Sequence, residues 1–403
     1  MCNNSFPCSG RRLHVVLIDI WRVVNAKGGT EKVFCDMANA LVRRGFEVST
    51  ICFDENKGLP GYPLDSDVKF INAHDEISHS FFDVFDGKFA AMVLSWSPSK
   101  RQRKFNRFAF KFRKQQEGIG KVIAQLEKVD VFVSYQTETT FILKELLDVK
   151  VPIVTMIHCK PGYYWKSSSF RFVKSAVEES NVVQVLLPEF VEDARLYVKK
   201  VPITVIPNVA PQYKDSANLK KKIIINVARF DKDKNPELLV RAFSLLKNRF
   251  PDWICEWWGE TSVNPALTKE MKDLIVREGL EDRFLLKGVT ANVPSKLKEA
   301  SIFAFPSLFE GFGLALAEAF AMGLPAVGCK DCSAVNTLIR DGENGFLTES
   351  TPEAFAKGLA KLMESEELRR KLGEEGKKDM KAYSADRVWG TWEKLIRGLA
   401  GCN

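Results

Sequence analysis

The order of apolar and polar positions along the chain predicts strands and helices in alternation. Residues 13–20 form a short continuous apolar run, which is typical of a strand buried on both faces of a parallel sheet. After a loop, residues 30–45 place apolar side chains at helical spacing and end at a glycine. Residues 47–53 form a second apolar run. Strand, glycine-containing turn, helix and strand in this order predict the start of a doubly wound α/β sheet.

This alternation runs through the chain in two cycles. In the first cycle, further strands are expected at residues 129–134, 151–157, 182–187 and 203–206. A Pro-Asn step at 207–208 precedes the second cycle. Its expected strands are 222–228, 253–258, 284–287, 302–305 and 326–328, and its expected helices are 236–248, 266–278, 352–364 and 367–381.

The two cycles predict two α/β domains. We expect a polar tail at residues 1–11, a first domain at 12–207, a second domain at 208–384 and an amphipathic helix in 385–403. Ligands of such sheets bind at the carboxyl ends of the strands. Functional residues should therefore directly follow strands.

Composition and charge narrow the class of protein. Hydrophobic residues make up 45% of the 403 positions and charged residues 27%, which fits a globular chain. No apolar run is long enough to predict a transmembrane helix. The polar start of the chain lacks the apolar core of a signal peptide, so we expect a cytoplasmic protein. The net charge of +8 favours anionic partners, which include nucleotide phosphates, lipid headgroups and nucleic acid.

The densest candidate chemistry lies in residues 305–327. Glu310 follows an expected strand, and Glu318 lies about one turn inside a short helix of Ala and Leu. Because helical side chains lean toward the helix N-terminus, both carboxylates can face one crevice. Free N–H groups at the helix start suit an anion such as phosphate, and they belong to the loop of Gly311, Phe312, Gly313 and Leu314. The pattern fits a nucleotide sugar; the alternative is an ordinary βα unit with solvated glutamates.

Two cations follow a strand of the second cycle. Arg229 and Lys234 come directly after the strand expected at 222–228. At an interdomain cleft, such cations can neutralise a diphosphate leaving group, because they act where negative charge develops. The alternative is a solvated basic turn, since Lys232 lies in the same turn.

These motifs resemble those of a known family. The run at 305–327 resembles the Glu-x7-Glu signature of retaining glycosyltransferases with two Rossmann-like domains, the group that includes the bacterial family 4 enzymes. The likeness covers both glutamates, the Phe-Gly-Leu, the small helix and the Gly-x-Pro stop at 323–325. Arg229 and Lys234 are similar to the Gly/Ala-Arg-x4-Lys element of that family. The resemblance extends from residue 13 to about residue 399.

Two elements of the first cycle also resemble the family. Gly28 and Gly29 open a helix in a Gly-Gly-Thr-Glu sequence similar to the family's Gly-Gly-x-Glu/Ser-Arg, with Lys32 where arginine is common. His158 ends a strand in a sequence that resembles Thr-x-x-His-x-x-Pro, whose histidine lies at the acceptor side of the donor sugar. Without the resemblance, the glycine pair is equally well a tight turn, and the histidine a structural one.

The resemblance implies a fold and an activity. The fold is GT-B, with two Rossmann-like α/β domains facing a central cleft and a C-terminal helix that crosses back to the first domain. The activity is transfer of a sugar, with retention, from a nucleotide-sugar donor to an acceptor hydroxyl, with UDP preferred over GDP. The expected acceptor is a glycan or a lipid-linked glycan in cell-surface polysaccharide, lipopolysaccharide or glycolipid assembly. The alternatives are a nucleotide-sugar epimerase of similar fold and a non-catalytic relative that binds sugar nucleotides or membranes.

The resemblance also assigns roles. Arg229 and Lys234 would take up diphosphate charge, and Glu318 would hold ribose hydroxyls. Glu310 would hold hydroxyls of the donor sugar or act as a nucleophile, and His158 completes the expected catalytic set. Further donor contacts are expected at Gly28, Gly29, Gly288, Val289, Gly311, Phe312, Gly313 and Leu314.

No metal or other cofactor is expected. The D-x-D sequences at 65–67 and 231–233 match the metal-binding pattern of the other glycosyltransferase fold, but neither follows a suitable strand. The second also lies inside the turn of Arg229 and Lys234, whose cations would replace the metal. A single C-x-x-C at 329–332 lacks the second pair of ligands that a zinc site needs.

One stretch lies outside the family pattern. Residues 100–114 combine eight Lys or Arg with four Phe. On a helix, three of the Phe share a face flanked by cations, which is typical of an interfacial helix on anionic lipid. This candidate membrane or acceptor patch comprises Lys100, Arg101, Arg103, Lys104, Phe105, Arg107, Phe108, Lys111 and Phe112. It would hold the protein peripherally on the inner face of the cell membrane, and residues 165–174 would extend it. The alternative is a domain helix whose Phe stripe is core; nucleic-acid binding is not expected without a recognition module.

Overall fold

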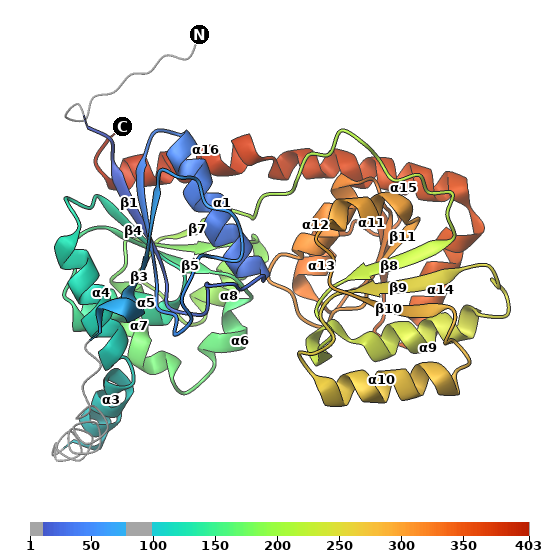
Figure 1. The fold of residues 1–403 in the computed structure, drawn as a ribbon, viewed down its shortest axis with the longest axis horizontal. Helices are drawn as coiled ribbons and strands as arrows, with labels where there is room; N and C mark the ends of the chain where they lie inside the picture. The colour runs from blue at the N-terminus through green and yellow to red at the C-terminus, as the bar shows by residue number, and fades with distance from the viewer. Residues whose placement is uncertain (1–10, 78–98, 403) are drawn as a thin grey trace, which may run out of the picture. The chain divides into compact units, whose positions relative to one another are not determined.

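The computed structural model describes residues 11–77 and 99–402, without the side chains of Lys100 and Arg101. The chain divides into two compact units (Figure 1). The first unit contains the chain up to Ile206 together with the residues from Trp389 on, and the second unit spans Pro207–Val388. Each unit contains one parallel sheet with helices between its strands, so the predicted pair of Rossmann-like folds is confirmed.

The first unit has a seven-stranded parallel sheet in the order β3-β2-β1-β4-β5-β6-β7. Its strands are β1 (His14–Asp19), β2 (Glu47–Cys52), β3 (Val68–Asn72), β4 (Val131–Ser134), β5 (Ile153–Ile157), β6 (Val182–Val185) and β7 (Ile203–Val205). Its helices are α1 (Gly29–Arg43), η1 (Ala73–Glu76), α3 (Lys100–Phe110), α4 (Arg113–Gln125), α5 (Thr137–Phe141), η3 (Ile142–Leu146), α6 (Pro161–Trp165), α7 (Phe170–Glu178) and α8 (Glu189–Arg195). The sequence patterns predicted every strand except β3, which carries a lysine between its apolar residues.

The second unit has a six-stranded parallel sheet in the order β10-β9-β8-β11-β12-β13. Its strands are β8 (Ile223–Val227), β9 (Ile254–Trp258), β10 (Phe284–Gly288), β11 (Ile302–Phe305), β12 (Ala326–Cys329) and β13 (Gly345–Thr348). Its helices are η4 (Lys232–Lys234), α9 (Pro236–Leu246), α10 (Pro265–Arg277), α11 (Val293–Glu299), α12 (Leu314–Ala321), α13 (Ser333–Leu338), α14 (Pro352–Glu364), α15 (Glu366–Asp379) and η5 (Met380–Tyr383).

Strand order fixes where each sheet can bind a ligand. In the first sheet β1 pairs with both β2 and β4, so the chain reverses its direction of winding between β1 and β4. In the second sheet β8 pairs with both β9 and β11. A crevice opens at the carboxyl ends of two such strands, because the connections leave them toward opposite faces of the sheet. The segments after β1 and β4, and those after β8 and β11, are therefore the positions favoured for ligands.

The last helix, α16 (Ala385–Leu399), returns to the first unit, as predicted (Figure 1). Glu393 pairs with Arg44 at 3.6 Å, from Oε2 to Nε. The Arg397 guanidinium lies 4.8 Å from the centre of the Phe46 ring. Trp392 and Ile396 are buried, so the apolar face of the helix is part of a core. Within residues 11–77 and 99–402, no helix combines the length and the hydropathy of a membrane span.

Helix α15 packs closely behind α12. A Cβ atom on Gly373 would lie 2.1 Å from the carbonyl oxygen of Gly323, the residue that terminates α12. A Cβ on Gly376 would lie 2.6 Å from Cδ1 of Phe320. The two glycines therefore allow the helices to approach, and the contact fixes α12 from its far side.

We predict that Gly373→Ala destabilises the protein. The added methyl group must displace backbone, and overpacking of this kind lowers the free energy of unfolding by about 1–3 kcal/mol. This loss should exceed the gain of up to about 1 kcal/mol that alanine brings to a helix. Urea unfolding measures the difference. Gly390→Ala in α16 is the matched control, because among the described residues no atom outside its own stretch of helix lies within 4 Å of the added Cβ. Equal stability of the two variants would contradict the close packing.

Candidate functional site

Two residues predicted separately from the sequence are joined in the second unit. Lys234, after β8, and Glu310, after β11, form an ion pair with 2.7 Å between Nζ and Oε1. Their side chains are 17% and 12% exposed. The backbones of the two loops are also linked, because Leu308 N–H donates to the Asp233 carbonyl at 2.8 Å. The pair therefore lies where the strand order reverses, the position at which such sheets bind ligands.

The turn that carries Lys234 is fixed locally. Asp231 is the N-cap of the short helix η4, and its carboxylate accepts from the Lys234 backbone N–H at 3.3 Å. Asn235 then takes the left-handed conformation, with φ +49°, and Pro236 begins α9. Asparagine tolerates this conformation and proline suits the first position of a helix, so the sequence ends one helix and begins the next within three residues. The direction of the Lys234 side chain is set by this turn.

Arg229 differs from Lys234 in its exposure. Its side chain is 63% exposed, and it forms an ion pair with Asp231 at 3.4 Å, from Nη2 to Oδ2. The neighbouring Gly259, at the end of β9, is required for close approach. A Cβ there would lie 1.9 Å from the Ala228 carbonyl oxygen. Of the two cations that follow β8, Lys234 is therefore largely buried and Arg229 is largely exposed to solvent.

The glycine loop leads directly into α12. Gly313 has φ +81°, the left-handed conformation that favours glycine, and α12 begins at the next residue. Phe312 is buried and its ring contacts that of Tyr383 edge-on, with 5.4 Å between ring centres. Because glycine has no side chain to cap the helix, the first turn of α12 has no side-chain cap at Gly313, and the anion site expected there stays a prediction.

Glu318 has an aromatic neighbour that the sequence did not indicate. Burial, together with the charge of Glu318, raises the pKa of the Tyr213 hydroxyl well above its ordinary value. Tyr213 lies in the irregular segment before β8, where no motif marked it. Tyr213 therefore lies close enough to the middle of α12 for the charge of Glu318 to act on its hydroxyl.

A buried thiol lies near the ion pair. Burial, reinforced by the charge of Glu310, raises the pKa of Cys332 to about 12, while Lys234 acts in the opposite direction. Cys329 is also buried, and both cysteines are free thiols. Among the described residues, no group of three or more His, Cys, Asp or Glu side chains is arranged to hold a metal ion.

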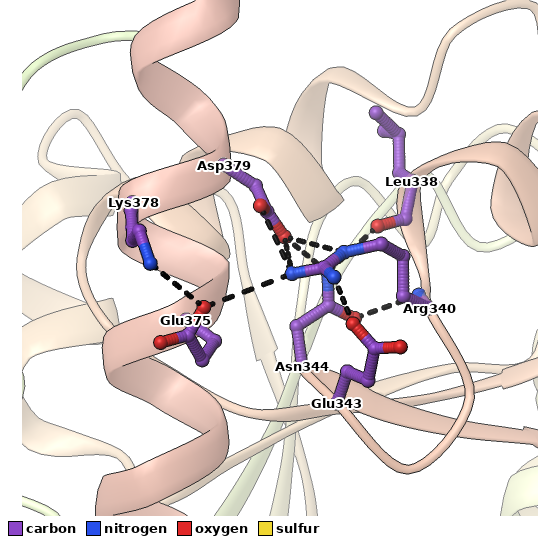
Figure 2. A network of polar contacts seen from close by, with 7 residues as sticks. All are labelled: Leu338, Arg340, Glu343, Asn344, Glu375, Lys378 and Asp379. Atoms are coloured by element: carbon purple, nitrogen blue, oxygen red, sulfur yellow. Dashed lines mark hydrogen bonds and ion pairs between the residues drawn. The ribbon is translucent and has the colours of Figure 1, made fainter.

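The loop between α13 and β13 is tied to the end of α15 (Figure 2). Arg340 donates to both oxygens of Asp379 at 2.9–3.1 Å and pairs with Glu343. Asn344 is fully buried and also donates to Asp379, at 2.9 Å. Asp379 directly precedes η5, which ends at Tyr383. The network therefore holds the segment whose last ring packs on Phe312.

Gly288 and Val289 lie at the carboxyl end of β10, on the same side of the second sheet as Arg229 after β8. Gly288 ends β10 with φ +72°, and its carbonyl accepts from Gly259 N–H at 2.9 Å. Val289 is 70% exposed. The carboxyl ends of β8, β9 and β10 are thus linked side by side, with Arg229 at one end and Val289 at the other.

The remaining predicted residues belong to the first unit. His158 follows β5, and its ring stacks on Tyr135 with 4.9 Å between centres and 26° between planes. Burial lowers the pKa of His158 to about 4, and its Nε2 has no hydrogen-bond partner among the described residues. The Tyr135 hydroxyl reaches α1, 3.4 Å from the Met37 sulfur. Tyr135 therefore connects His158 to the helix that Gly28 and Gly29 begin.

Two buried carboxylates hold the loop before α1. Asp54 accepts from the N–H groups of Val23 and Val24 at 2.9 and 2.8 Å. Asp19, the last residue of β1, accepts from the Gln136 amide at 2.7 Å. Burial raises the pKa of Asp19 to about 6. The sequence signal for this network is an aspartate, Asp19, at the end of an apolar strand.

The candidate membrane patch has its aromatic rings turned inward. Phe108 is buried, and the rings of Phe105, Phe108 and Phe112 all contact Phe141 of α5. Phe172 of α7 contacts Phe105 and Phe108. The Phe stripe therefore packs within the first unit. This agrees with the alternative interpretation, a domain helix whose Phe side chains belong to the core.

Comparison with known proteins identifies the family. The model of the family described as "Glycosyl transferases group 1" matches residues 212–379, the part of the chain with Arg229, Lys234 and both glutamates. Residues 212–379 belong to the group 1 glycosyl transferases. Among curated relatives of this glycosyltransferase, an uncharacterized glycosyltransferase of Haemophilus influenzae is 23% identical over 384 residues, 93% of this chain and 97% of that protein.

Two further relatives carry more specific names. A PP-undecaprenol-glycan α-1,4-N-acetyl-D-galactosaminyltransferase of Campylobacter jejuni is 24% identical, over 92% of this glycosyltransferase and 95% of that protein. An exopolysaccharide phosphotransferase of Streptomyces coelicolor is 30% identical over 200 residues, but the match spans 49% of this chain and only 21% of that longer protein.

Solved structures share the fold. Sucrose-phosphate synthase from Thermosynechococcus elongatus superimposes with a TM-score of 0.77 at 17% identity, over 97% of this glycosyltransferase and all of that chain. A TarM variant from S. aureus, in complex with UDP among other ligands, gives a TM-score of 0.74 at 16% identity, over 95% and 99% of the two chains. The predicted GT-B fold is confirmed.

We predict a pH dependence of stability that His158 causes. Its pKa is about 4 in the folded protein and near 6.5 when unfolded, so the unfolded chain binds more protons between these values. The free energy of unfolding should therefore fall as the pH drops from about 6.5 to about 4. His158→Phe keeps a ring on Tyr135 and should reduce this fall by on the order of 1–3 kcal/mol. Urea unfolding across this pH range measures it.

Asp19→Asn tests the same reasoning with the opposite sign. The pKa of Asp19 is raised to about 6, so the folded protein binds more protons between about 4 and 6. Its contribution to stability therefore increases as the pH falls, and Asp19→Asn should steepen the acid loss. If both variants follow the wild-type profile, neither group is buried as described.

Proposed function

We propose that this chain transfers a sugar, with retention, from a UDP-sugar in preference to a GDP-sugar, to the hydroxyl of a cell-surface glycan or lipid-linked glycan. The observation that carries the proposal is the Lys234–Glu310 pair, with Arg229 beside it, where the strand order of the second sheet reverses. It combines cations for a diphosphate with a carboxylate for sugar hydroxyls.

The two cations would act on the leaving group. As the bond between the anomeric carbon and the phosphate oxygen breaks, its electron pair goes to the diphosphate. Arg229 and Lys234 would stabilise this charge, which is where fixed cations lower a barrier most. The acceptor oxygen bonds to the anomeric carbon on the same face, and its proton passes to the departing phosphate.

Glu310 would bind the donor sugar through its hydroxyls. Its carboxylate already pairs with Lys234 at 2.7 Å. A carboxylate whose charge is neutralised at this distance is a weaker nucleophile, which supports the role of hydroxyl ligand over a covalent intermediate. Glu318 would hold the ribose, with Tyr213 beside it, and the first N–H groups of α12 would face the phosphates.

In the first unit, His158 would bind a hydroxyl as a neutral imidazole. Its pKa of about 4 leaves it uncharged near neutral pH. A neutral ring can accept a hydrogen bond at one nitrogen and donate one at the other. Gly28 and Gly29 would allow a close approach of the backbone to the ligand.

The proposed class of acceptor is based on the names of similar proteins. The Campylobacter jejuni relative is named for a PP-undecaprenol-linked glycan, and TarM was solved with α-GlcNAc-glycerol and UDP. These names favour a cell-surface polymer or its lipid-linked precursor as the acceptor. Membership of the glycosyltransferase family disfavours the epimerase alternative. The cytoplasmic location expected from the sequence remains a prediction.

A donor screen tests the proposed function. Purified protein is incubated with UDP- and GDP-sugars, and thermal stabilisation and nucleotide release are measured with and without short glycan acceptors. We expect acceptor-dependent release of UDP and a product with the anomeric configuration of the donor. A change in the sugar of the donor without nucleotide release would instead identify an epimerase.

Arg229→Ala and Lys234→Ala test the charge role. Removing a group that stabilises transition-state charge lowers kcat by roughly 100- to 1000-fold. We expect losses of this size in turnover of the preferred donor. Lys232→Ala is the matched control, because it removes an exposed cation from the same turn and should leave kcat within about threefold of wild type. Near-normal turnover of Arg229→Ala would refute the proposed role.

A further inference from the structure

A short helical segment of the second unit contacts one of the elements proposed to hold the donor. This segment is η5, which follows α15 and ends at Tyr383. The Tyr383 ring contacts the Phe312 ring of the glycine loop, with 5.4 Å between ring centres. The carbonyl oxygen of Tyr383 accepts a hydrogen bond from the N–H of Ala210 at 2.9 Å. Tyr383 therefore contacts the glycine loop through its ring and the segment before β8 through its backbone.

The segment before β8 leads to the other element of the proposed donor site. The Gln212 side-chain amide donates to the Met380 carbonyl at 2.9 Å, so η5 is bound at both of its ends. The next residue is Tyr213, and burial together with the charge of Glu318 raises the pKa of its hydroxyl. Glu318 is the residue proposed to hold the ribose. The segment η5 is thus linked to the phosphate side of the proposed site and also to its ribose side.

The start of η5 is fixed by the residue directly before it. Asp379 ends α15, and its carboxylate accepts three hydrogen bonds from the Arg340 guanidinium at 2.9–3.1 Å (Figure 2). Asn344 is fully buried and donates to the same carboxylate at 2.9 Å. Its amide oxygen accepts from the Arg340 backbone N–H, also at 2.9 Å. The loop between α13 and β13 therefore holds the point at which the chain leaves α15.

The contact between Arg340 and Asp379 fixes geometry more than it adds stability. The two side chains are 42% and 29% exposed, and ion pairs that water reaches contribute little to the free energy of unfolding. A guanidinium that donates to both oxygens of a carboxylate instead sets the orientation of both groups. The orientation matters here because the residue after Asp379, Met380, is buried, and the ring three residues further on packs against the glycine loop.

We propose that Asp379 is a positioning residue for the nucleotide donor, together with Arg340 and Asn344. It acts through η5, which holds the glycine loop through Phe312 and the ribose side of the site through the segment of Tyr213. This role rests on the proposed function, because it takes a nucleotide sugar as the ligand of these elements. The network therefore affects binding of the donor and leaves binding of the acceptor unchanged.

Steady-state kinetics of the full chain test this role, with donor and acceptor varied separately. Asp379→Ala removes the group that accepts from Arg340 and Asn344, so η5 loses its fixed start. Residues that act on a site through others change its affinity by roughly 2- to 30-fold, and we expect a rise of about tenfold in the KM for the donor. The Kd for UDP, measured by calorimetry, should rise by a similar factor. The kcat and the KM for the acceptor should stay within about twofold of wild type.

Glu364→Ala is the matched control. Glu364 is the last residue of α14, as Asp379 is of α15, and it also pairs with an arginine, Arg249. This pair joins α14 to the segment after α9. The KM for the donor should therefore stay within about twofold of wild type, because the loss of an exposed ion pair alone has little effect.

Tyr383→Ala tests the connection through η5. It removes the ring that packs on Phe312, and it should raise the KM for the donor as Asp379→Ala does. Because both residues act through one segment, the double variant should resemble the weaker-binding single variant instead of showing the product of the two effects. If Asp379→Ala does not fold, Arg340→Lys replaces it. Lysine keeps the charge and loses the two-point contact, so the expected rise is about threefold.

Three outcomes would overturn the positioning role. They are an unchanged KM for the donor in Asp379→Ala, an equal rise in Glu364→Ala, and an equal rise in the KM values for donor and acceptor. If the wild-type chain neither binds UDP nor transfers a sugar, the proposed function fails and the positioning role fails with it. If the wild-type chain does both and Asp379→Ala binds the donor normally, only the positioning role is refuted.

Discussion

The ion pair between Lys234 and Glu310 is the contact on which the proposed site in the second unit depends. It joins two loops that are 76 residues apart in sequence, and the backbone bond from Leu308 to Asp233 joins the same loops beside it. A partly buried ion pair is weak support for stability, because desolvation offsets most of the attraction between its charges. A fold has little reason to keep such a pair for stability alone. Its position at the strand reversal is what a ligand site requires.

The rest of the second unit fixes the loops on either side of this pair. Helix α12 begins at the glycine loop and is braced from behind by α15, through contacts that only glycine permits at Gly373 and Gly376. At the end of α15, the Asp379 carboxylate accepts hydrogen bonds from Arg340 and Asn344. The turn that follows places the ring of Tyr383 against that of Phe312. The position of Phe312 in the glycine loop thus depends on the end of α15, more than 50 residues later in the chain.

Features that depend on neighbouring residues in the sequence could be predicted, and contacts between residues far apart in the sequence could not. Buried parallel strands such as β1 and β8 are continuous apolar runs, and so they were predicted. The edge strands β3 and β13 are short and partly exposed, and their patterns were too weak. The residues at strand ends were predicted because ligands bind at the carboxyl ends of such strands and because the motifs resemble those of the family. The stack of Tyr135 on His158 was not, since it joins two strand ends and neither residue marks the other in sequence.

The Phe stripe of α3 shows a different limit. Its spacing correctly indicates a helix with one apolar face, and the same spacing describes an interfacial helix and a helix of the domain core. Periodicity gives the direction of the face and not the partner that covers it. Here the partners of Phe108 are Phe141 and Phe172, which lie 33 and 64 residues later in the chain.

The charges of the two units favour different tasks in the proposed reaction. The second unit places two cations at the end of β8, where they can stabilise a departing diphosphate. In the first unit, His158 is a neutral imidazole with a pKa of about 4. A general base is most effective when its pKa lies near the working pH, and an imidazole of this pKa is a weak base. His158 is therefore better suited to orienting a hydroxyl than to deprotonating it. With no strong base assigned to the acceptor, the leaving phosphate is the remaining group in the scheme to take the proton, which is the chemistry of front-face transfer with retention.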